Sequence, residues 1–142
     1  MGTVDEEITL RNAIDAGNVR CGIIKGPQVR EATVRVVVDT GAETLVITEE
    51  IQKELGLLTE LRRRATLANG ETVVCNIAET VEVCWKDRST TCRPWVLPGA
   101  KEALLGAIPL EDMDLMVNPV DKKLIGVHGD KPMGHIYSVT NN

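Results

Sequence analysis

Val36-Val37-Val38-Asp39-Thr40-Gly41-Ala42 is the stretch that decides how this sequence is interpreted. An apolar, β-branched run leads directly into an aspartate, which a threonine and a glycine follow. β-Branched residues favour strands, whereas Asp and Gly favour turns, so we expect a strand that ends at Asp39. A carboxylate held there is a candidate acid–base group, although an isolated Asp-Thr-Gly is more often an ordinary turn.

The motif occurs once in the sequence. Hydrolysis by paired carboxylates needs two aspartates that face each other. Asp112, Asp114 and Asp121 stand in turn or helix contexts without an apolar approach, so we expect them to be surface charges. The second carboxylate would therefore have to come from a partner chain.

The composition is that of one soluble globular domain. The chain has 142 residues, of which 43% are hydrophobic and 26% are charged. With two Trp, one Tyr and no Phe, the core must be aliphatic. We expect a single domain over residues 1–128, followed by a polar, loosely ordered tail over residues 129–142.

Charge and aromatic content argue against nucleic-acid and membrane partners. The net charge is −5, and the aromatic fraction of 2% leaves no platform on which bases could stack. The single basic cluster, Arg62-Arg63-Arg64, is interpreted as a solvated stretch of an exposed strand. No apolar run approaches the roughly 18 residues of a membrane-spanning helix.

The four cysteines indicate a reducing compartment. Their spacings lack a paired C-x-x-C signature, and the only histidines, His128 and His135, stand near the C-terminal end. We therefore expect free buried thiols, a cytoplasmic location, no metal and no cofactor.

Patterning predicts an all-β domain with one or two short helices. Asn69-Gly70 joins two strand-like runs and predicts a hairpin with a type I′ turn. Thr48 is a good cap for a helix that Gly56 ends, and Pro109 can start a second helix. Residues 18–28 are expected to form a loop with a short strand, and strand 32–38 is expected to be buried on both faces. The other predicted strands cover residues 7–11, 45–47, 61–68, 71–78, 80–85, 90–97, 115–117 and 123–125.

These elements resemble, in order, a retropepsin-like aspartic protease of the retroviral type (clan AA), in the form of a small prokaryotic homologue. Residues 37–42 resemble the active-site turn of that family, and residues 45–56 resemble the strand and helix that follow it. The Asn69-Gly70 hairpin occupies the position of the substrate-covering flap. Leu104-Leu105-Gly106 resembles the segment that closes the second half of the acid-protease barrel. The resemblance covers roughly residues 5–127.

Some features depart from the retroviral pattern. Ile108 stands two residues after the second glycine, where retroviral members commonly have Asp or Asn. The flap hairpin has no aromatic residue, and the N-terminal portion, residues 1–31, is longer than in those enzymes.

The resemblance implies an aspartic endopeptidase that works as a homodimer on peptide or protein substrates. Asp39 of each chain would share one proton across a two-fold axis, Thr40 would hydrogen-bond across the interface, and Gly41 would leave room for backbone N–H groups. The implied substrate-binding residues are Ala42, Thr66, Ala68, Asn69, Gly70 and Thr72. The alternative is a catalytically weak module of the same fold that dimerises or binds peptides. The intact Asp-Thr-Gly favours the enzyme.

Overall fold

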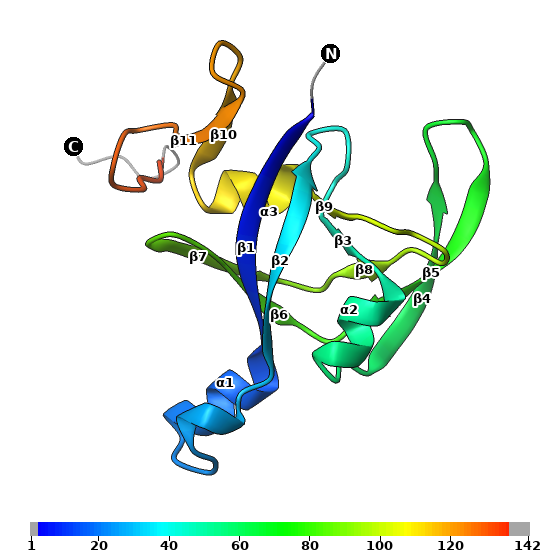
Figure 1. Cartoon of the computed structure of the whole chain (residues 1–142), viewed down its shortest axis with the longest axis vertical. Coiled ribbons are helices and arrows are strands. Elements are labelled where there is room, and N and C mark those ends of the chain that lie inside the picture. The colour runs from blue at the N-terminus through cyan, green and yellow to red at the C-terminus, as the bar shows by residue number, and fades with distance from the viewer. Residues whose placement is uncertain (1–2, 137–142) are drawn as a thin grey trace.

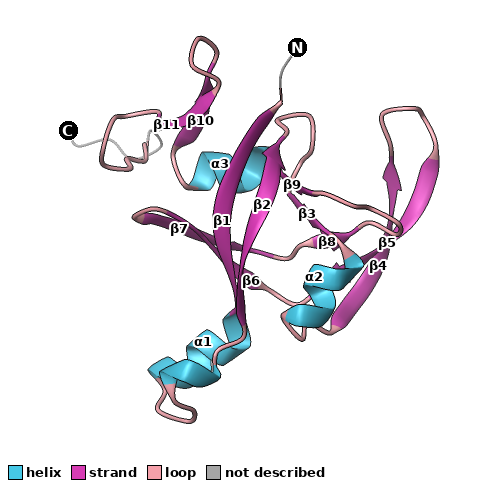
Figure 2. Ribbon diagram, viewed as in Figure 1, coloured by secondary structure: helices cyan, strands magenta, loops and turns pink. Residues whose placement is uncertain are grey.

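The computed structural model describes residues 3–136 and confirms a mostly β fold with short helices (Figure 2). Nine strands form one strongly curved sheet in the order β4-β5-β8-β3-β9-β2-β1-β6-β7, and β10 and β11 form a separate hairpin. The strands are β1 (Val4–Asn12), β2 (Glu31–Val38), β3 (Leu45–Ile47), β4 (Thr59–Thr66), β5 (Thr72–Ala78), β6 (Val81–Trp85), β7 (Arg88–Cys92), β8 (Trp95–Val96), β9 (Ala103–Leu105), β10 (Leu115–Asn118) and β11 (Lys123–Gly126). The helices are α1 (Ala13–Arg20), α2 (Glu49–Glu54) and α3 (Ala107–Asp112), with a 3-10 turn, η1, at Gly26–Gln28.

Three strands of this sheet bring distant parts of the sequence together. β2 pairs with β1 in antiparallel fashion, and on its other side it pairs with β9 in parallel. The register sets Val38 opposite Leu105, so the chain leaves β2 beside the end of β9. β9 also pairs with β3, which places the loop between β2 and β3 next to Gly106.

The core is aliphatic, as the composition predicts. Its members come from both halves of the chain and are almost completely buried. They form one hydrophobic cluster, which joins the curved sheet to α3 and to the β10–β11 hairpin. The largest fully buried side chains are those of Ile8, Leu10, Leu45, Ile47, Leu55, Ile77, Leu105 and Met113.

Helix α1 lies outside the predicted elements, and residues 18–28 contain no strand. The fold therefore has three α-helices in residues 3–136, where one or two were expected. The buried Asn12 caps α1, because its side-chain oxygen accepts the Asp15 N–H at 3.1 Å. Asp15 in turn holds the Arg30 guanidinium through two hydrogen bonds of 2.8 and 3.0 Å. A polar cap and an ion pair fix this short helix, and neither produces an apolar periodicity.

Strand β2 alternates between buried and more exposed residues, and the prediction that it is buried on both faces is wrong. Ala32 and Val36 face the core, whereas the Arg35 side chain is exposed and pairs with Asp5. One face of β2 is thus covered by the core, as in an antiparallel sheet with one solvated side.

The β4–β5 hairpin is present, but its turn is not the predicted type I′. Gly70 has a positive φ of 86°, whereas Asn69 has none. Leu67 N–H donates to Glu71 O at 2.8 Å, and Gly70 N–H donates to Leu67 O at 2.9 Å. These bonds enclose a three-residue loop, a type of hairpin that needs a left-handed residue only at its last position. β4 is an edge strand, and its three consecutive arginines are exposed as predicted.

The second half of the chain differs from the sequence interpretation at two charged residues. The sequence predicts a polar turn over residues 86–89, between the predicted strands 80–85 and 90–97. Arg88 instead begins β7 and is 5% exposed, so the turn after β6 consists of Lys86 and Asp87. Asp114 was expected at the surface, but it is 8% exposed. All four cysteines are free, although Cys75 is buried and Cys21 is exposed.

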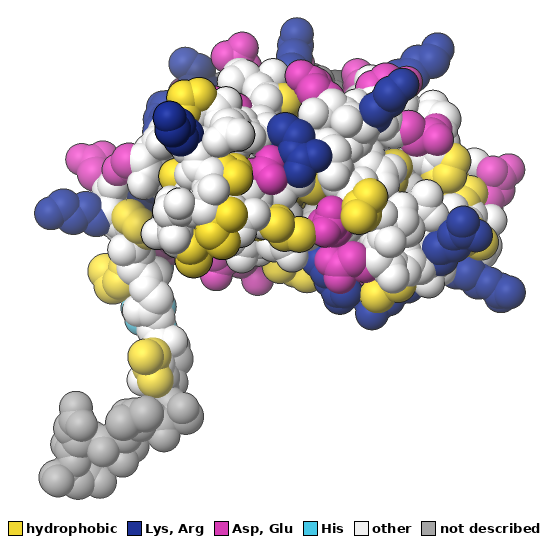
Figure 3. Space-filling view, turned by 90° about the horizontal axis from the view of Figure 1, so that it is seen from below, with side chains coloured by type: hydrophobic (Ala, Val, Ile, Leu, Met, Phe, Trp, Pro, Cys, Tyr) yellow, Lys and Arg dark blue, Asp and Glu magenta, His cyan; other side chains and the backbone are white. Residues whose placement is uncertain are grey.

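Residues 129–136 contain no helix or strand. Two hydrogen bonds attach their first part to the domain: Arg88 donates to Gly129 O, and Met133 N–H donates to Asp114. Towards residue 136 the segment extends away from the body of the molecule (Figure 3). The division of the chain at residue 128 stays a prediction, and residues 137–142 of the predicted tail lie outside the described residues. No helix within residues 3–136 is long and apolar enough to cross a membrane.

Candidate active site

The Asp39 turn begins where β2 leaves the sheet. Asp39 N–H donates to Leu105 O at 3.0 Å, which continues the parallel pairing of β2 and β9 by one residue. Two residues later, Gly41 N–H donates to the Asp39 Oδ1 at 2.9 Å, and Ala42 N–H donates to Asp39 O at 3.1 Å. The carboxylate therefore lies over its own turn, where the Gly41 N–H holds it. Asp39 is half-buried in this position.

Gly41 allows this close approach. A Cβ on Gly41 would lie 3.1 Å from Asp39 Oδ1, closer than a side chain normally packs. Thr40 and Gly41 are exposed, and Ala42 is half-buried. Within residues 3–136, the Gly41 N–H is the one hydrogen-bond donor that the Asp39 carboxylate has, and no cation pairs with it.

The start of α3 supports the turn from behind. Ala107 N–H donates to Ala42 O at 2.9 Å, and Ile108 N–H donates to Glu43 O at 2.8 Å. The helix begins at Ala107, two residues before Pro109, so its first N–H groups are free to make these bonds. The Ile108 side chain is 57% exposed, so this position contributes through its backbone, where retroviral members commonly have a polar side chain.

Gly106 is the most constrained position behind the turn. A Cβ there would overlap Thr44 O and Ala42 O, so the loop can approach α3 only over a glycine. From the sequence, Gly106 is predicted to be part of the barrel and not a site residue. Its place directly after two leucines was the available signal.

Cys92 packs under the far side of the same loop, against Thr44 and the backbone of Leu45. Burial raises the pKa of its thiol to about 11, despite the hydrogen bonds to those two residues. The thiol therefore stays protonated and serves as a packing group in this position.

The predicted substrate-binding residues other than Ala42 lie on the β4–β5 hairpin. Thr66 ends β4, Thr72 begins β5, and Ala68, Asn69 and Gly70 form the loop between them; all five are exposed. The hairpin loop and the Asp39 turn lie at the same end of the molecule, opposite α1 (Figure 1). No hydrogen bond joins the hairpin to the Asp39 turn within residues 3–136.

Asp39 lines neither of two cavities in the described part of the chain. One of about 520 Å³ is lined by residues that include Asp5, Val37 and Lys101. A smaller one of about 280 Å³ is lined by Arg11, Cys84 and Asp112, among others. Among the described residues, no three His, Cys, Asp or Glu side chains meet at a point where they could hold a metal ion. One chain thus presents an open turn with a carboxylate and not a closed site.

Comparisons with known proteins identify a family and similar solved structures. The model of a family described as aspartyl protease matches residues 24–128, a span that includes the Asp39 turn, the β4–β5 hairpin and Gly106. Among solved structures, the chain is similar to the crystal structure of a retropepsin-like aspartic protease from Rickettsia conorii. The two share 17% sequence identity with a TM-score of 0.46, over 83% of this chain and 89% of that one. No curated protein matches the sequence.

Proposed function

Since the chain belongs to the aspartyl protease family, we propose that it is an aspartic endopeptidase that acts as a homodimer. Asp39 of each chain supplies one carboxylate of the catalytic pair. The observation that carries this proposal is the environment of Asp39. Its residue is half-buried, its carboxylate accepts one backbone N–H, and no charged partner faces it among residues 3–136.

Three other aspartates of the described chain, among them the two that are buried, are already engaged by partners. Asp114 is buried against His128, Asp15 is paired with Arg30, and Asp112 accepts a hydrogen bond from Thr90. Each of them is occupied by a partner in its own part of the fold. A second copy of the Asp39 turn, related by a two-fold axis, completes the pair.

The pair divides the work of acid and base. Two carboxylates in contact cannot both ionise cheaply, so they hold one proton between them and titrate as a unit. The ionised carboxylate takes a proton from water as the water oxygen attacks the peptide carbonyl carbon, and the protonated one donates to the carbonyl oxygen. When the tetrahedral intermediate collapses, the first carboxylate gives the proton that it took from water to the amide nitrogen, and the C–N bond breaks. The second carboxylate takes its proton back from a hydroxyl group of the intermediate, which leaves a carboxylic acid and an amine.

The backbone around Asp39 keeps the carboxylate in place during these steps. Gly41 holds one carboxylate oxygen, while the N–H groups of Ala107 and Ile108 fix the loop from behind. Thr40, exposed at the tip of the turn, is placed to hydrogen-bond across the interface. A turn fixed in advance loses little entropy when substrate binds.

The β4–β5 hairpin serves as the flap. Its loop residues Ala68, Asn69 and Gly70 are small or polar, and Thr66 and Thr72 flank them. Such a loop contacts an extended peptide through its backbone, as an added strand does, and shields the carboxylates from water.

Asp39→Asn is the direct test. The variant should lose cleavage of an unfolded protein substrate and keep the dimer mass of the wild type in sedimentation. Asp87→Asn is the matched control, because Asp87 is an exposed aspartate in the β6–β7 turn. Wild-type cleavage by Asp39→Asn would refute the paired carboxylates. Peptide binding without cleavage by the wild type would indicate a binding module instead.

A further inference from the structure

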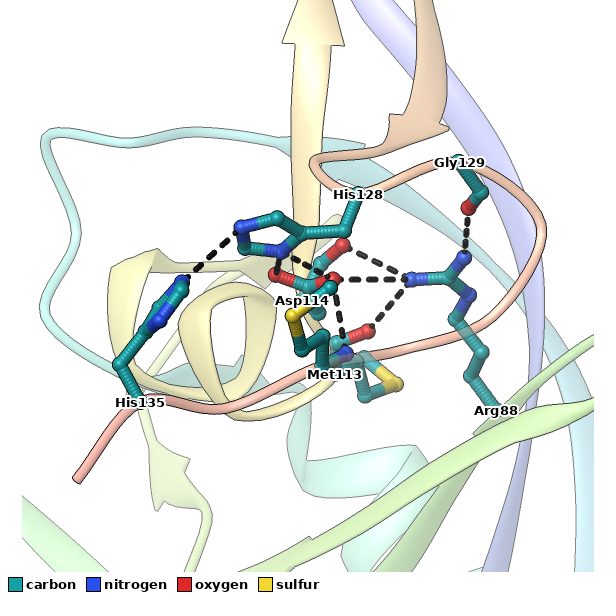
Figure 4. A network of polar contacts seen from close by, with 7 residues as sticks. Arg88, Met113, Asp114, His128, Gly129 and His135 are labelled. Carbon is teal, nitrogen blue, oxygen red and sulfur yellow. Dashed lines mark hydrogen bonds and ion pairs between the residues drawn. The ribbon is translucent and has the colours of Figure 1, made fainter. Parts of the chain in front are cut away.

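Both histidines of the chain lie side by side, although the function proposed above uses neither. His128 follows β11, and His135 lies in the C-terminal segment (Figure 4). Their Nε2 atoms are 3.2 Å apart, and their ring centroids are 5.0 Å apart with the planes inclined by 62°.

Asp114 fixes the protonation of the His128 ring. The His128 Nδ1 lies 2.9 Å from each carboxylate oxygen of Asp114. An ionised carboxylate only accepts hydrogen bonds, so Nδ1 carries the proton. In the neutral ring, Nε2 therefore presents its lone pair, and this is the atom that faces His135.

The Asp114 carboxylate is itself held from two sides. Burial raises the pKa of this carboxyl, but the hydrogen bonds from His128 and from Met133 N–H outweigh that effect and lower it overall. Arg88, 4% exposed in its side chain, places its Nη1 3.9 Å from Asp114 Oδ2. The same guanidinium donates to the carbonyl oxygens of Met113, Asp114 and Gly129 (Figure 4).

This arrangement is that of a metal-ligating histidine with its supporting carboxylate, and we propose that His128 and His135 together bind one divalent transition-metal ion through their Nε2 atoms. Two imidazole nitrogens bound about 2.0–2.1 Å from one Zn²⁺ at a tetrahedral angle lie about 3.3 Å apart, with ring centroids about 5 Å apart. The observed separations of 3.2 and 5.0 Å agree with this geometry. A carboxylate on the second ring nitrogen is the usual support of such a ligand.

The donor set selects the kind of ion. Imidazole nitrogens suit Zn²⁺, Ni²⁺ and Cu²⁺, whereas Mg²⁺ and Ca²⁺ prefer oxygen ligands. The described residues bring no third ligand to the ion, so water completes its coordination. Asp114 contacts the ring and not the ion, and it acts as a positioning residue.

The consequence for the fold is a closed loop at the C-terminal end. The ion links His128, two residues after β11, to His135, so residues 129–134 become a loop fixed at both ends. Arg88 and Asp114 already hold this loop at Gly129 and Met133. The metal adds a third point of attachment.

Zinc titration of the tag-free, full-length chain tests the proposal. Because the chain has only two histidines, an imidazole NMR spectrum reports on this site alone. Both histidines should shift together and stop shifting at one Zn²⁺ per chain. Mg²⁺ should leave the spectrum unchanged.

Three variants separate this site from other zinc binding. His135→Gln should abolish the shift of His128, and Asp114→Asn should weaken zinc binding about 10–100-fold while both histidines remain present. Cys21→Ser removes the exposed thiol and should leave the titration unchanged. The proposal is overturned if Zn²⁺ shifts neither histidine signal, or if it shifts the His128 signal equally in His135→Gln. The two rings would then be joined by a hydrogen bond alone.

Discussion

Two aspartates stand in turns on the same domain, and their surroundings are opposite. Asp39 follows β2, is half-buried, and accepts one hydrogen bond, from the Gly41 N–H. Asp114 lies between α3 and β10 at a positive φ of 57°, is buried, and is surrounded by His128, Met133 N–H and Arg88.

The difference separates a carboxylate that is open to other molecules from one that holds the structure together. Burying a charge is tolerated only when partners satisfy it, and the partners of Asp114 do so within its own chain. Asp39 is left with lone pairs that nothing in the described chain uses. A carboxylate so placed, yet rigidly held, is available to water, to a substrate and to a second copy of itself.

Replacing each aspartate by asparagine should have the largest effect, because one variant should lose activity and the other should lose stability. Asp39→Asn should lower the cleavage rate by about 10²–10⁴-fold, the usual contribution of a general acid–base group, with an unchanged melting temperature. Asp114→Asn should lower the melting temperature and leave the cleavage rate of the folded protein near that of the wild type. Rates on an unfolded substrate and thermal melts of both variants check this. The comparison fails if the two variants lose activity equally at a temperature where both are folded.

Removal of the Arg88 guanidinium should have the largest effect on stability. Arg88→Met removes a hydrogen-bond donor from the carbonyl oxygens of Met113, Asp114 and Gly129, of which Asp114 O keeps the Val127 N–H. It also removes the cation 3.9 Å from the Asp114 carboxylate, and we expect a loss of about 3 kcal/mol in the free energy of unfolding. Arg62→Met on the exposed edge strand is the control, since Arg62 is exposed. Urea denaturation measures both. A loss equal to that of the control would mean that the Asp114 region is not held as described.

Gly106→Ala tests the support behind the Asp39 turn. The added methyl group would overlap the carbonyl oxygens of Ala42 and Thr44, so we expect a cost of about 1–3 kcal/mol and a displaced Asp39 turn. Gly134→Ala is the matched control, because a Cβ at Gly134 would meet no neighbouring atom. Urea denaturation gives the free energy of unfolding of both variants, and their cleavage rates show whether the Asp39 turn is displaced. An active and fully stable Gly106→Ala would show that the turn does not depend on its contact with α3.

The Asp15–Arg30 ion pair extends the comparison to the stability of the protein at acidic pH. The hydrogen bonds from the Arg30 side chain lower the pKa of Asp15, although burial opposes them. The pair therefore stabilises the fold above the unfolded-state pKa of about 3.9, and this contribution is lost as the pH falls through the lower folded-state value. Asp15→Asn should be less stable than the wild type at neutral pH, and the difference should shrink below about pH 3.9. Urea denaturation across a pH series measures the difference in the free energy of unfolding between the two proteins. A difference that stays constant with pH would contradict this prediction.

The Asp39 region was predictable because its signals are local. A β-branched run predicts β2, and the Asp-Thr-Gly that follows predicts its turn. Thr48 caps α2 as its position suggests, accepting the Ile51 N–H at 3.2 Å. The family resemblance assigned Leu104-Leu105-Gly106 to the barrel, but it did not predict that Gly106, directly after β9, packs behind the turn.

The Asp114 region was not predictable, because its partners come from distant positions. Arg88 is 26 residues away on β7, and it is read from sequence as part of a polar turn. Nothing near Asp114 indicates that a buried guanidinium and a histidine will meet it. The same holds for α1, where Asn12 reaches across to Leu55 O and Asp15 to Arg30. Polar contacts between distant residues leave no periodic pattern in a sequence.

Mixing wild-type and Asp39→Asn chains tests the central claim, that Asp39 is half of a site completed by a second chain. The two proteins are unfolded together, refolded at varied ratios and assayed at constant total concentration. If each active dimer needs two Asp39 carboxylates, cleavage falls as the square of the wild-type fraction. A linear fall with the wild-type fraction would show that one chain cuts alone, and would contradict the account.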